Sequence, residues 1–427
     1  MSDVTRRAIE AVWRIESAKV IAAVARMVRD VGLAEDLAQD ALVSALEHWP
    51  EAGVPANPGA WLTTTAKNRA LDRLRHERMA QGKLTELGLD LEAMAAHVVP
   101  DFVDALDARR ADEIGDELLS LIFTACHPVL PPDGRVALTL KLLGGLSTSD
   151  IARAFLVPEP TMAQRIVRAK RTLSSARVPF EVPRGQELRE RLASVLSVIY
   201  LIFNEGYSAS AGEDWMRPAL CDEALRLGRM LADLAREEPE VHGLLSLMCL
   251  QASRARARVD AQGQPVLLMD QDRRQWDSLL IRLGLQALER AQQHAGHRHE
   301  PLGPYALQAA IAACHARAPA ASDTDWPGIV ALYDALCQLA PSPVVELNRA
   351  VAIGMAYGPQ AALDIVEKLA DEPSLQRYQW LPSVRGDLLS RLGRHEEARQ
   401  AFLSAAELAG NEQDRKLLLA RAQGRSP

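Results

Sequence analysis

The chain has little of what β-sheets, disulfide frameworks and membrane spans require. Aromatic residues make up 4% of the 427 residues and no alternating run of β-branched residues occurs, so we expect an all-α protein. No apolar run is as long as a membrane span, and the N-terminus lacks the apolar core of a signal peptide. We therefore expect a cytoplasmic protein without a membrane partner. Five cysteines without CxxC spacing are expected to be buried thiols in a reducing compartment: Cys126, Cys221, Cys249, Cys314 and Cys337.

Positive charge is absent from one long segment and concentrated in others. The net charge of −7 by itself argues against a nucleic-acid-binding protein. However, no Lys or Arg occurs between Asp30 and Ala66, whereas basic residues gather in two later segments. Because the charge is segregated, the average conceals what single segments do. The length allows two or three domains.

The stretch from Leu146 to Leu173 has the pattern of a helix-turn-helix. Ser147 and Asp150 give a capping-box start to a short helix, Val157 and Pro158 break it, and a second helix follows. Pro160 suits the first turn of that helix, where a missing N–H costs nothing. The predicted apolar faces are Ile151, Ala152 and Phe155 in the first helix, and Met162, Ile166, Val167, Ala169 and Leu173 in the second.

The second helix of this pair is basic. Between Glu159 and Arg177 there are five basic residues and one acidic residue. Polar side chains near its N-terminus can reach base edges, and the later cations can reach phosphates. A packed helical hairpin with a solvated basic face is the alternative. The candidate DNA contacts are Thr161, Gln164, Arg165, Arg168, Lys170 and Arg171.

Three helices are predicted near the N-terminus. The first runs from about Val4 to Asp30, with a predicted inner face of Ile15, Val20, Ile21, Val24 and Met27. The second is acidic, which indicates either an ordinary solvated face or a dock for a basic partner; its apolar stripe is Leu33, Leu37, Ala41, Leu42, Ala45 and Leu46. After a loop over 50–59, the third helix is basic and carries Trp61, which suits either a protein core or a surface for unpaired bases.

These segments together resemble RNA polymerase sigma factors of the extracytoplasmic-function (ECF) type. The resemblance rests on AEDLAQDALVSALEHW, NPGAWLTTTAKNRALDRLR, an acidic linker and the helix-turn-helix, in the family's order over about Ile15 to Leu173. It implies a factor that binds core RNA polymerase and promoter DNA, needs no cofactor or metal, and performs no catalysis. The threonine triplet 63–65 and Pro160 depart from the common family pattern, which leaves the base preference open.

The resemblance also implies roles for single residues. The clamp coiled coil of the largest polymerase subunit would bind Asp36, Leu37, Gln39, Asp40 and Leu42. The minus-ten element would be opened by Asn57, Trp61, Thr64 and Asn68, with its backbone held by Arg69, Arg73 and Arg75. The minus-thirty-five element would be read by the candidate contacts of the basic second helix.

The predicted domains follow from this order. Residues 1–83 form the first sigma domain and 115–178 the helix-turn-helix domain, whose supporting helices are expected over 116–125 and 134–143. Between them, residues 84–114 form an acidic linker: 85–113 holds eight acidic and two basic residues, a net charge of −6. Such a segment suits either a solvated tether or a strand that follows a basic channel.

Residues 186–427 form a further helical region. A helix over 188–203 is predicted to stop at Asn204-Glu205-Gly206, with the glycine in the left-handed conformation. Two polar segments offer candidate regulatory residues: Glu205, Tyr207, Asp270, Asp272, Arg273 and Trp276. The aspartates suit a helix cap better than a metal site because other calcium ligands are missing. The histidines at 294, 297 and 299 are expected in an exposed loop and not in a zinc site.

A repeat marks the C-terminal part, at about 340–410. Gly358 and Gly393 occupy equivalent turns between helix pairs, a pattern that resembles tetratricopeptide repeats (TPR). Stacked pairs could hold a peptide or a neighbouring part of the same chain. Segments such as LIFNEGYSAS and DQDRRQW resemble the extension of one ECF subgroup, in which the extension stands in for an anti-sigma protein.

The sequence therefore predicts an ECF-type sigma factor regulated by its own extension. The alternative is a helix-turn-helix operator-binding regulator with a helical domain that senses a ligand or peptide. An enzyme has little support, because no nucleophile, base and orienting partner occur at a convincing spacing.

Overall fold

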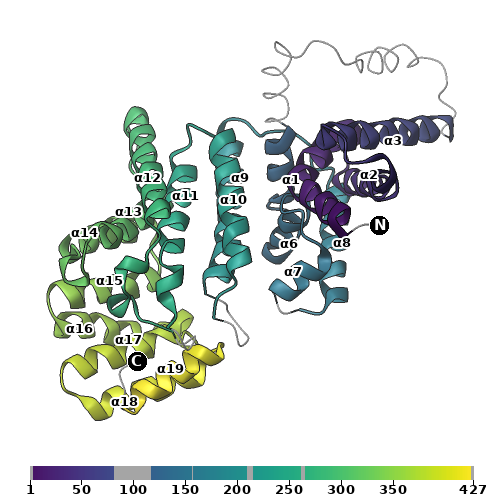
Figure 1. Cartoon of the computed structure of the whole chain (residues 1–427). Helices are drawn as coiled ribbons and strands as arrows, with labels where there is room; N and C mark the ends of the chain where they lie inside the picture. Colours follow the sequence, from purple (N-terminus) through teal and green to yellow (C-terminus); the bar gives the residue numbers. More distant parts are fainter. Residues whose placement is uncertain (1–2, 81–116, 156, 209–214, 261–264, 425–427) are drawn as a thin grey trace. The chain divides into compact units, whose positions relative to one another are not determined.

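The computed structural model describes residues 3–80, 117–155, 157–208, 215–260 and 265–424 (Figure 1). The predicted all-α class is confirmed, since the regular structure in these ranges is helical apart from one isolated bridge between Val259 and Pro265. The predicted acidic linker, at 84–114, lies outside the described residues. The described helices include none that is long and apolar enough to cross a membrane.

The chain forms two compact units, Met1–Val198 and Ile199–Pro427. Unit 1 begins with α1 (Asp3–Val28), α2 (Val31–Ala52) and α3 (Pro58–Ala80), which all contact one another. Fully buried alanines such as Ala34, Ala38 and Ala66 line this bundle. Because an alanine adds little bulk, the backbones can approach closely and the basic and acidic helices share one small core.

Two details of this bundle differ from the sequence prediction. On α1, Val20, Ile21 and Val24 are buried as expected, but Ile15 is 65% exposed and Met27 is only half-buried. The loop expected from Pro50 begins instead at Gly53, which ends α2 with a φ of 85°. A proline in the last helical turn removes only one backbone hydrogen bond, and the buried Trp49 keeps this turn in the core.

The rest of unit 1 is a second helical group. It contains a helix over 117–125, α6 (Pro132–Leu142), α7 (Thr148–Ala154), α8 (Glu159–Ser175) and the first part of α9 (Gly185–Tyr207). Two side chains of α9 join this group: Arg191 donates to the Phe123 carbonyl at 2.9 Å, and Ser194 donates to the Cys126 carbonyl at 2.7 Å. The start of α9 is therefore part of the core of unit 1.

Unit 2 begins with helices that pack around α11. After the end of α9 come α10 (Pro218–Leu234), α11 (Pro239–Ala252), α12 (Ser278–Arg298), α13 (Pro304–Arg317) and α14 (Trp326–Leu339). Helix α11 contacts α10, α12 and α13 and is buried almost along its whole length. Short 3₁₀ turns lie between them: η1 (Ala255–Arg258), η2 (Leu268–Asp270), η3 (Arg273–Gln275) and η4 (Ala321–Asp323).

The predicted helix stop at 204–206 is wrong. Helix α9 continues through Gly206 to Tyr207, and the φ of Gly206 is not positive. The glycine serves another purpose, because a Cβ at this position would lie 2.6 Å from the backbone nitrogen of Cys221. Close packing, and not a left-handed turn, requires glycine here.

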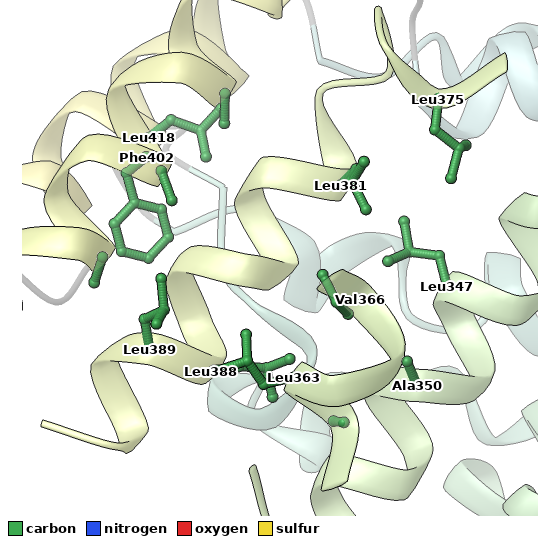
Figure 2. Close-up of a cluster of buried hydrophobic side chains, with 14 of the residues drawn as sticks. Leu347, Ala350, Leu363, Val366, Leu375, Leu381, Leu388, Leu389, Phe402 and Leu418 are labelled. Carbon is green, nitrogen blue, oxygen red and sulfur yellow. The ribbon is translucent and has the colours of Figure 1, made fainter. Parts of the chain in front are cut away.

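The C-terminal helices form the predicted pairs. They are α15 (Pro343–Ala356), α16 (Pro359–Leu369), α17 (Trp380–Arg391), α18 (His395–Leu408) and α19 (Glu412–Ala422), with η5 (Pro373–Leu375) between the pairs. Gly358 and Gly393 lie in the two equivalent turns with φ of 103° and 77°. One apolar cluster, which includes Leu347, Leu363, Leu388 and Phe402, runs through both pairs (Figure 2). This is the shared core that a stack of repeats requires.

The cysteines are all free in the described residues, but only two are as buried as expected. Cys126 and Cys249 are buried, and burial raises the pKa of each thiol to about 11. Cys221, Cys314 and Cys337 are only partly buried.

Candidate nucleic-acid interface

The predicted helix-turn-helix forms as expected. Ser147 and Asp150 make the full capping box at the start of α7, and hydrogen bonds from Ser147 are the main reason that the pKa of Asp150 lies below its ordinary value. Pro160 lies in the first turn of α8. The apolar positions of both helices are buried or half-buried, with one exception: Val167 is 45% exposed.

The six candidate DNA contacts of α8 do not share one surface. Thr161, Gln164, Arg168 and Arg171 are exposed and follow the i, i+3, i+7, i+10 spacing of one helix face. We call these four residues the recognition stripe. Their side chains are open to a groove of DNA, which a helix of this kind can enter.

Arg165 and Lys170 lie elsewhere on α8 and have partners within unit 1. Arg165 lies 3.5 Å from a carboxylate oxygen of Asp133 at the start of α6. Lys170 is 20% exposed and its Nζ lies 2.5 Å from Glu35 Oε2 on α2. In this arrangement neither side chain is free for a nucleic acid.

The candidate residues on α3 include both exposed and packed side chains. Asn57, Thr64 and Asn68 are exposed, and the Asn57 side chain also accepts from the Ala60 N–H at 3.0 Å, which caps the helix. Trp61 is half-buried and meets Trp49 edge to face, with the ring centroids 5.3 Å apart. Trp61 thus has a packing role on one side and an exposed part on the other.

The basic residues of α3 are mostly tied to neighbours. Arg69 donates to Ser44 Oγ at 2.6 Å and lies 3.3 Å from Asp40. Arg75 pairs with Asp72 at 3.4 Å on an exposed surface, where such a pair contributes little and is easily exchanged. Arg73 is exposed.

The predicted polymerase-binding residues of α2 are also divided. Asp36 and Asp40 have 70% and 58% of their side chains exposed, and Gln39 is exposed beside them. Leu42 is half-buried, whereas Leu37 is a core residue with 7% exposure. Asp36, Gln39 and Asp40 therefore form the accessible polar edge of α2.

In unit 2, three candidate regulatory residues meet in one stack. We call this arrangement the arginine–aromatic stack, because arginine and aromatic side chains alternate in it. Its order is Trp215, Arg258, Tyr207, Arg254, Trp276 and Arg273. The sequence did not predict Trp215, Arg254 or Arg258 as candidates. Arg258 lies 4.3 Å from the ring centroid of Trp215 and 3.6 Å from that of Tyr207. Arg254 lies 5.9 Å from Tyr207 and from Trp276, and Arg273 lies 4.9 Å from Trp276. Each contact is a cation–π interaction.

Oxygen atoms fix the two ends of this arginine–aromatic stack. Arg273 donates to the carbonyls of His315 and Ala318 at 2.5 and 2.7 Å, and burial lowers the pKa of Arg273. At the other end, the indole of Trp215 donates to Asp414 of α19 at 3.0 Å. The stack thus connects the first helices of unit 2 with its last described helix. In the sequence, the two arginines at 254 and 258, four residues apart, were the signal that could have indicated this stack.

The remaining candidates of unit 2 have local roles. Glu205 forms an ion pair with Arg217. Asp272 caps η3 and bonds to Arg274, which holds the pKa of this carboxyl at about 2, and Asp270 is exposed. The helix cap expected from this aspartate–arginine segment is thus present, although α12 itself is capped by Asp277.

The histidines at 294 and 297 lie on α12 and not in a loop, and His299 ends that helix in the left-handed conformation. Across the described ranges, no group of three or more His, Cys, Asp or Glu residues is arranged to hold a metal ion.

Comparison with known families agrees with the geometry of unit 1. Residues 14–79 match sigma-70 region 2, and residues 120–173 match sigma-70 region 4. Residues 191–292 match a family of unknown function, DUF6596. This last match includes every residue of the arginine–aromatic stack. The matches to regions 2 and 4 coincide with the two helical groups of unit 1 and support a sigma factor that acts in transcription initiation.

Similar proteins support this class. An uncharacterized protein of Rhizobium meliloti is 45% identical over 394 residues, which is 92% of this chain and 90% of that protein. The ECF RNA polymerase sigma factors SigK of Mycobacterium ulcerans and Mycobacterium tuberculosis are 29% identical over 159 residues, which is 36% of this chain and 78% of theirs. The chain belongs to the same family as the Rhizobium protein, and its two sigma-70 regions are similar to those of the ECF sigma factors.

Proposed function

We propose that this sigma factor directs core RNA polymerase to promoters through two separate surfaces. The polar edge of α2, formed by Asp36, Gln39 and Asp40, would bind the clamp coiled coil of the largest polymerase subunit. Leu37 supports this edge from the core and Leu42 borders it. The exposed side of α3, with Asn57, Trp61, Thr64 and Asn68, would capture the minus-ten element, and Arg73 and Arg75 would contact its backbone.

The recognition stripe carries this proposal. Thr161 and Gln164 lie in the first turns of α8, where they can reach base edges, and Arg168 and Arg171 follow further along the same exposed face, where they can reach phosphates. Four exposed polar side chains on one face of the second helix of a helix-turn-helix suit the major groove. We assign to this stripe the reading of the minus-thirty-five element. No bond chemistry is required of the protein.

Unit 2 is proposed to regulate this activity. The supporting observation is the hydrogen bond between Trp215 and Asp414, because it docks a segment near the start of unit 2 on the helix that follows the repeats. Gln379 donates to the other oxygen of Asp414 at 3.0 Å. The helix that follows the repeats is therefore held within unit 2 at both oxygens of Asp414, and we propose that the repeats act within the chain and not on a separate peptide.

Run-off transcription tests the proposal. Purified core polymerase receives this protein as the only added factor, together with genomic promoter fragments that include its own upstream region. We expect specific transcripts that are lost in Asp40→Arg, which disrupts the edge of α2, and in Gln164→Ala with Arg168→Ala, which disrupts the stripe. Arg184→Ala, an exposed arginine outside both surfaces, is the control. Tight DNA binding without polymerase and without transcripts would instead indicate an operator-binding regulator.

A further inference from the structure

Helix α8 of region 4, on a side away from the recognition stripe, touches helix α2 of region 2 inside unit 1. Helix α8 lies against the first turn of α2: a Cβ on Gly32 would lie 3.5 Å from Lys170 Cδ and 3.7 Å from Lys170 Cβ. The ammonium group of Lys170 also lies 3.5 Å from Asp36 Oδ1. A lysine proposed to contact DNA therefore pairs with an aspartate proposed to contact polymerase.

Glu35 is at the centre of this contact. Its side chain is 3% exposed, although it is a charged residue in the first turns of α2. Two lysines of region 4 approach it, Lys170 of α8 at 2.5 Å and Lys141 of α6 at 3.6 Å. A buried carboxylate is tolerated only when it is paired, so region 4 supplies the positive charge that region 2 needs at this point.

A second pair lies away from Glu35. Arg26 of α1 lies 2.9 Å from Glu117, a residue with 7% side-chain exposure in the helix that begins region 4. The contact between the two regions thus involves α1 and α2 on one side and α6, α8 and the helix at 117–125 on the other. Regions 2 and 4 are docked at two points by ion pairs of opposite polarity.

From these contacts we infer that unit 1 has a self-docked form in which Lys170 of region 4 masks Asp36, at one end of the polymerase-binding edge of region 2, and that Glu35 with Lys141 and Lys170 holds this form closed. The inference rests on the proposed function of the two surfaces. Binding of polymerase at Asp36 requires Lys170 to leave, and its departure frees that lysine for the DNA backbone. The two events are therefore coupled.

A zero-length carbodiimide cross-link tests the docking without any polymerase. This reagent joins a carboxylate and an amine that are in direct contact. In the free full-length protein we expect an amide between Asp36 and Lys170, detected by mass spectrometry of the digested chain, because the Asp36 side chain is 70% exposed to the reagent and lies 3.5 Å from the Lys170 ammonium. Glu16 and Lys19, 3.2 Å apart within α1, are the internal positive control. Formation of the control link without any link between Asp36 and Lys170 would overturn the inference.

Polymerase affinity tests the masking. The variants are Glu35→Gln and Lys141→Gln, which lie outside the proposed polymerase and DNA contacts. Since apparent affinity is the intrinsic affinity multiplied by the open fraction, a form that is closed in about 90% of molecules predicts a dissociation constant about tenfold lower in either variant. A thermal scan verifies that each variant folds. If Glu35→Gln does not fold, Lys141→Gln carries the test alone, because its side chain is 18% exposed at the edge of the contact. An unchanged dissociation constant in the folded variants would contradict the masking.

The two proposals fail in different ways. If the wild-type chain drives specific transcription but forms no cross-link between Asp36 and Lys170, the docked form is wrong and the sigma function stands. If the cross-link forms but neither wild type nor variants bind core polymerase or give transcripts, the proposed function is wrong and the docked form stands.

Discussion

At the scale of single residues, two arginines of unit 2 surround the neutral imidazole of His315. Arg254 and Arg273 lie close enough to His315 to oppose its protonation, and this residue is 8% exposed. Burial, and then these two arginines, lower the pKa of His315 from 6.5 to about 4. The folded protein thus keeps this histidine neutral where an unfolded chain would protonate it.

The sign of the pH dependence follows from this shift. In the unfolded chain His315 takes up a proton below about pH 6.5, but in the folded chain only below about pH 4, so stability is lost as the pH falls through this window. We expect the free energy of unfolding of His315→Gln to fall less between pH 6.5 and pH 4 than that of the wild type, by up to about 3 kcal/mol. Urea unfolding at several pH values measures it. His297→Gln, on an exposed residue, should retain the wild-type profile; an identical profile in His315→Gln would contradict the assignment.

At the scale of helices, two glycines in α-helices show how context decides the effect of one methyl group. Gly206 of α9 faces the backbone of Cys221 at 2.6 Å, whereas Gly296 of α12 has no atom within 4 Å of an added Cβ. Both have ordinary helical φ.

Gly206→Ala should therefore lower the free energy of unfolding by about 1–3 kcal/mol, because the neighbouring helix must shift. Gly296→Ala should raise it by up to about 1 kcal/mol, since alanine is the better helix former. Urea denaturation of the two variants compares them directly. Equal effects would mean that the approach of α9 to α10 is looser than the structure shows.

The recognition stripe leads to a second prediction for a single helix. Removal of the exposed Arg168 removes one phosphate contact, so the slope of log affinity against log salt should become less steep by about 1. Titration of fluorescent promoter DNA with the polymerase complex at several salt concentrations measures the slope. Arg184→Ala is the matched control, and a slope unchanged by Arg168→Ala would remove this residue from the interface.

Several helix starts and turns were predictable because local sequence patterns determine them. The capping box at Ser147, Pro160 in the first turn of α8 and the glycine turns of the repeats are short-range signals, and all are present. Local sequence patterns do not predict the burial of a side chain correctly where contacts with residues distant in sequence determine it. Ile15 and Val167 continue an apolar face but nothing covers them enough to bury them.

The arginine–aromatic stack could be predicted only in part for the same reason. Tyr207, Arg273 and Trp276 attract attention as polar or aromatic groups near chain breaks. Their partners Arg258 and Trp215 lie 43 residues apart in sequence, from position 258 back to 215, and only the tertiary fold brings them together. Likewise, no periodicity indicates that Lys170 faces Glu35 and not solvent.

At the scale of the whole molecule, the division between the units falls inside α9, at Val198 and Ile199. The first part of this helix belongs to unit 1, through Arg191 and Ser194. Arg135 of α6 also donates to Ser194 Oγ at 2.6 Å. Region 4 therefore depends on residues that follow the sigma-70 match.

Two truncations test this dependence. A chain that ends at residue 198 keeps these bonds, whereas a chain that ends at residue 184 loses three of them and leaves the Phe123 and Cys126 carbonyls without their partners. At about 1 kcal/mol for each bond, the shorter chain should be less stable by about 3 kcal/mol or more. Urea unfolding of both proteins measures the difference, and equal stability would show that region 4 folds without α9.

The unbroken α9 also limits how such a protein can be assembled from parts. Domains that are exchanged between genes are usually joined by exposed linkers with few contacts across them. Here a helix without an interruption supplies core residues to unit 1 and continues into unit 2. A crossover within 185–207 would damage both products, so an exchange of extensions between such factors must either occur upstream of Gly185 or carry the whole helix along. Because the start of α9 packs against region 4, this helix is expected to have been inherited with region 4.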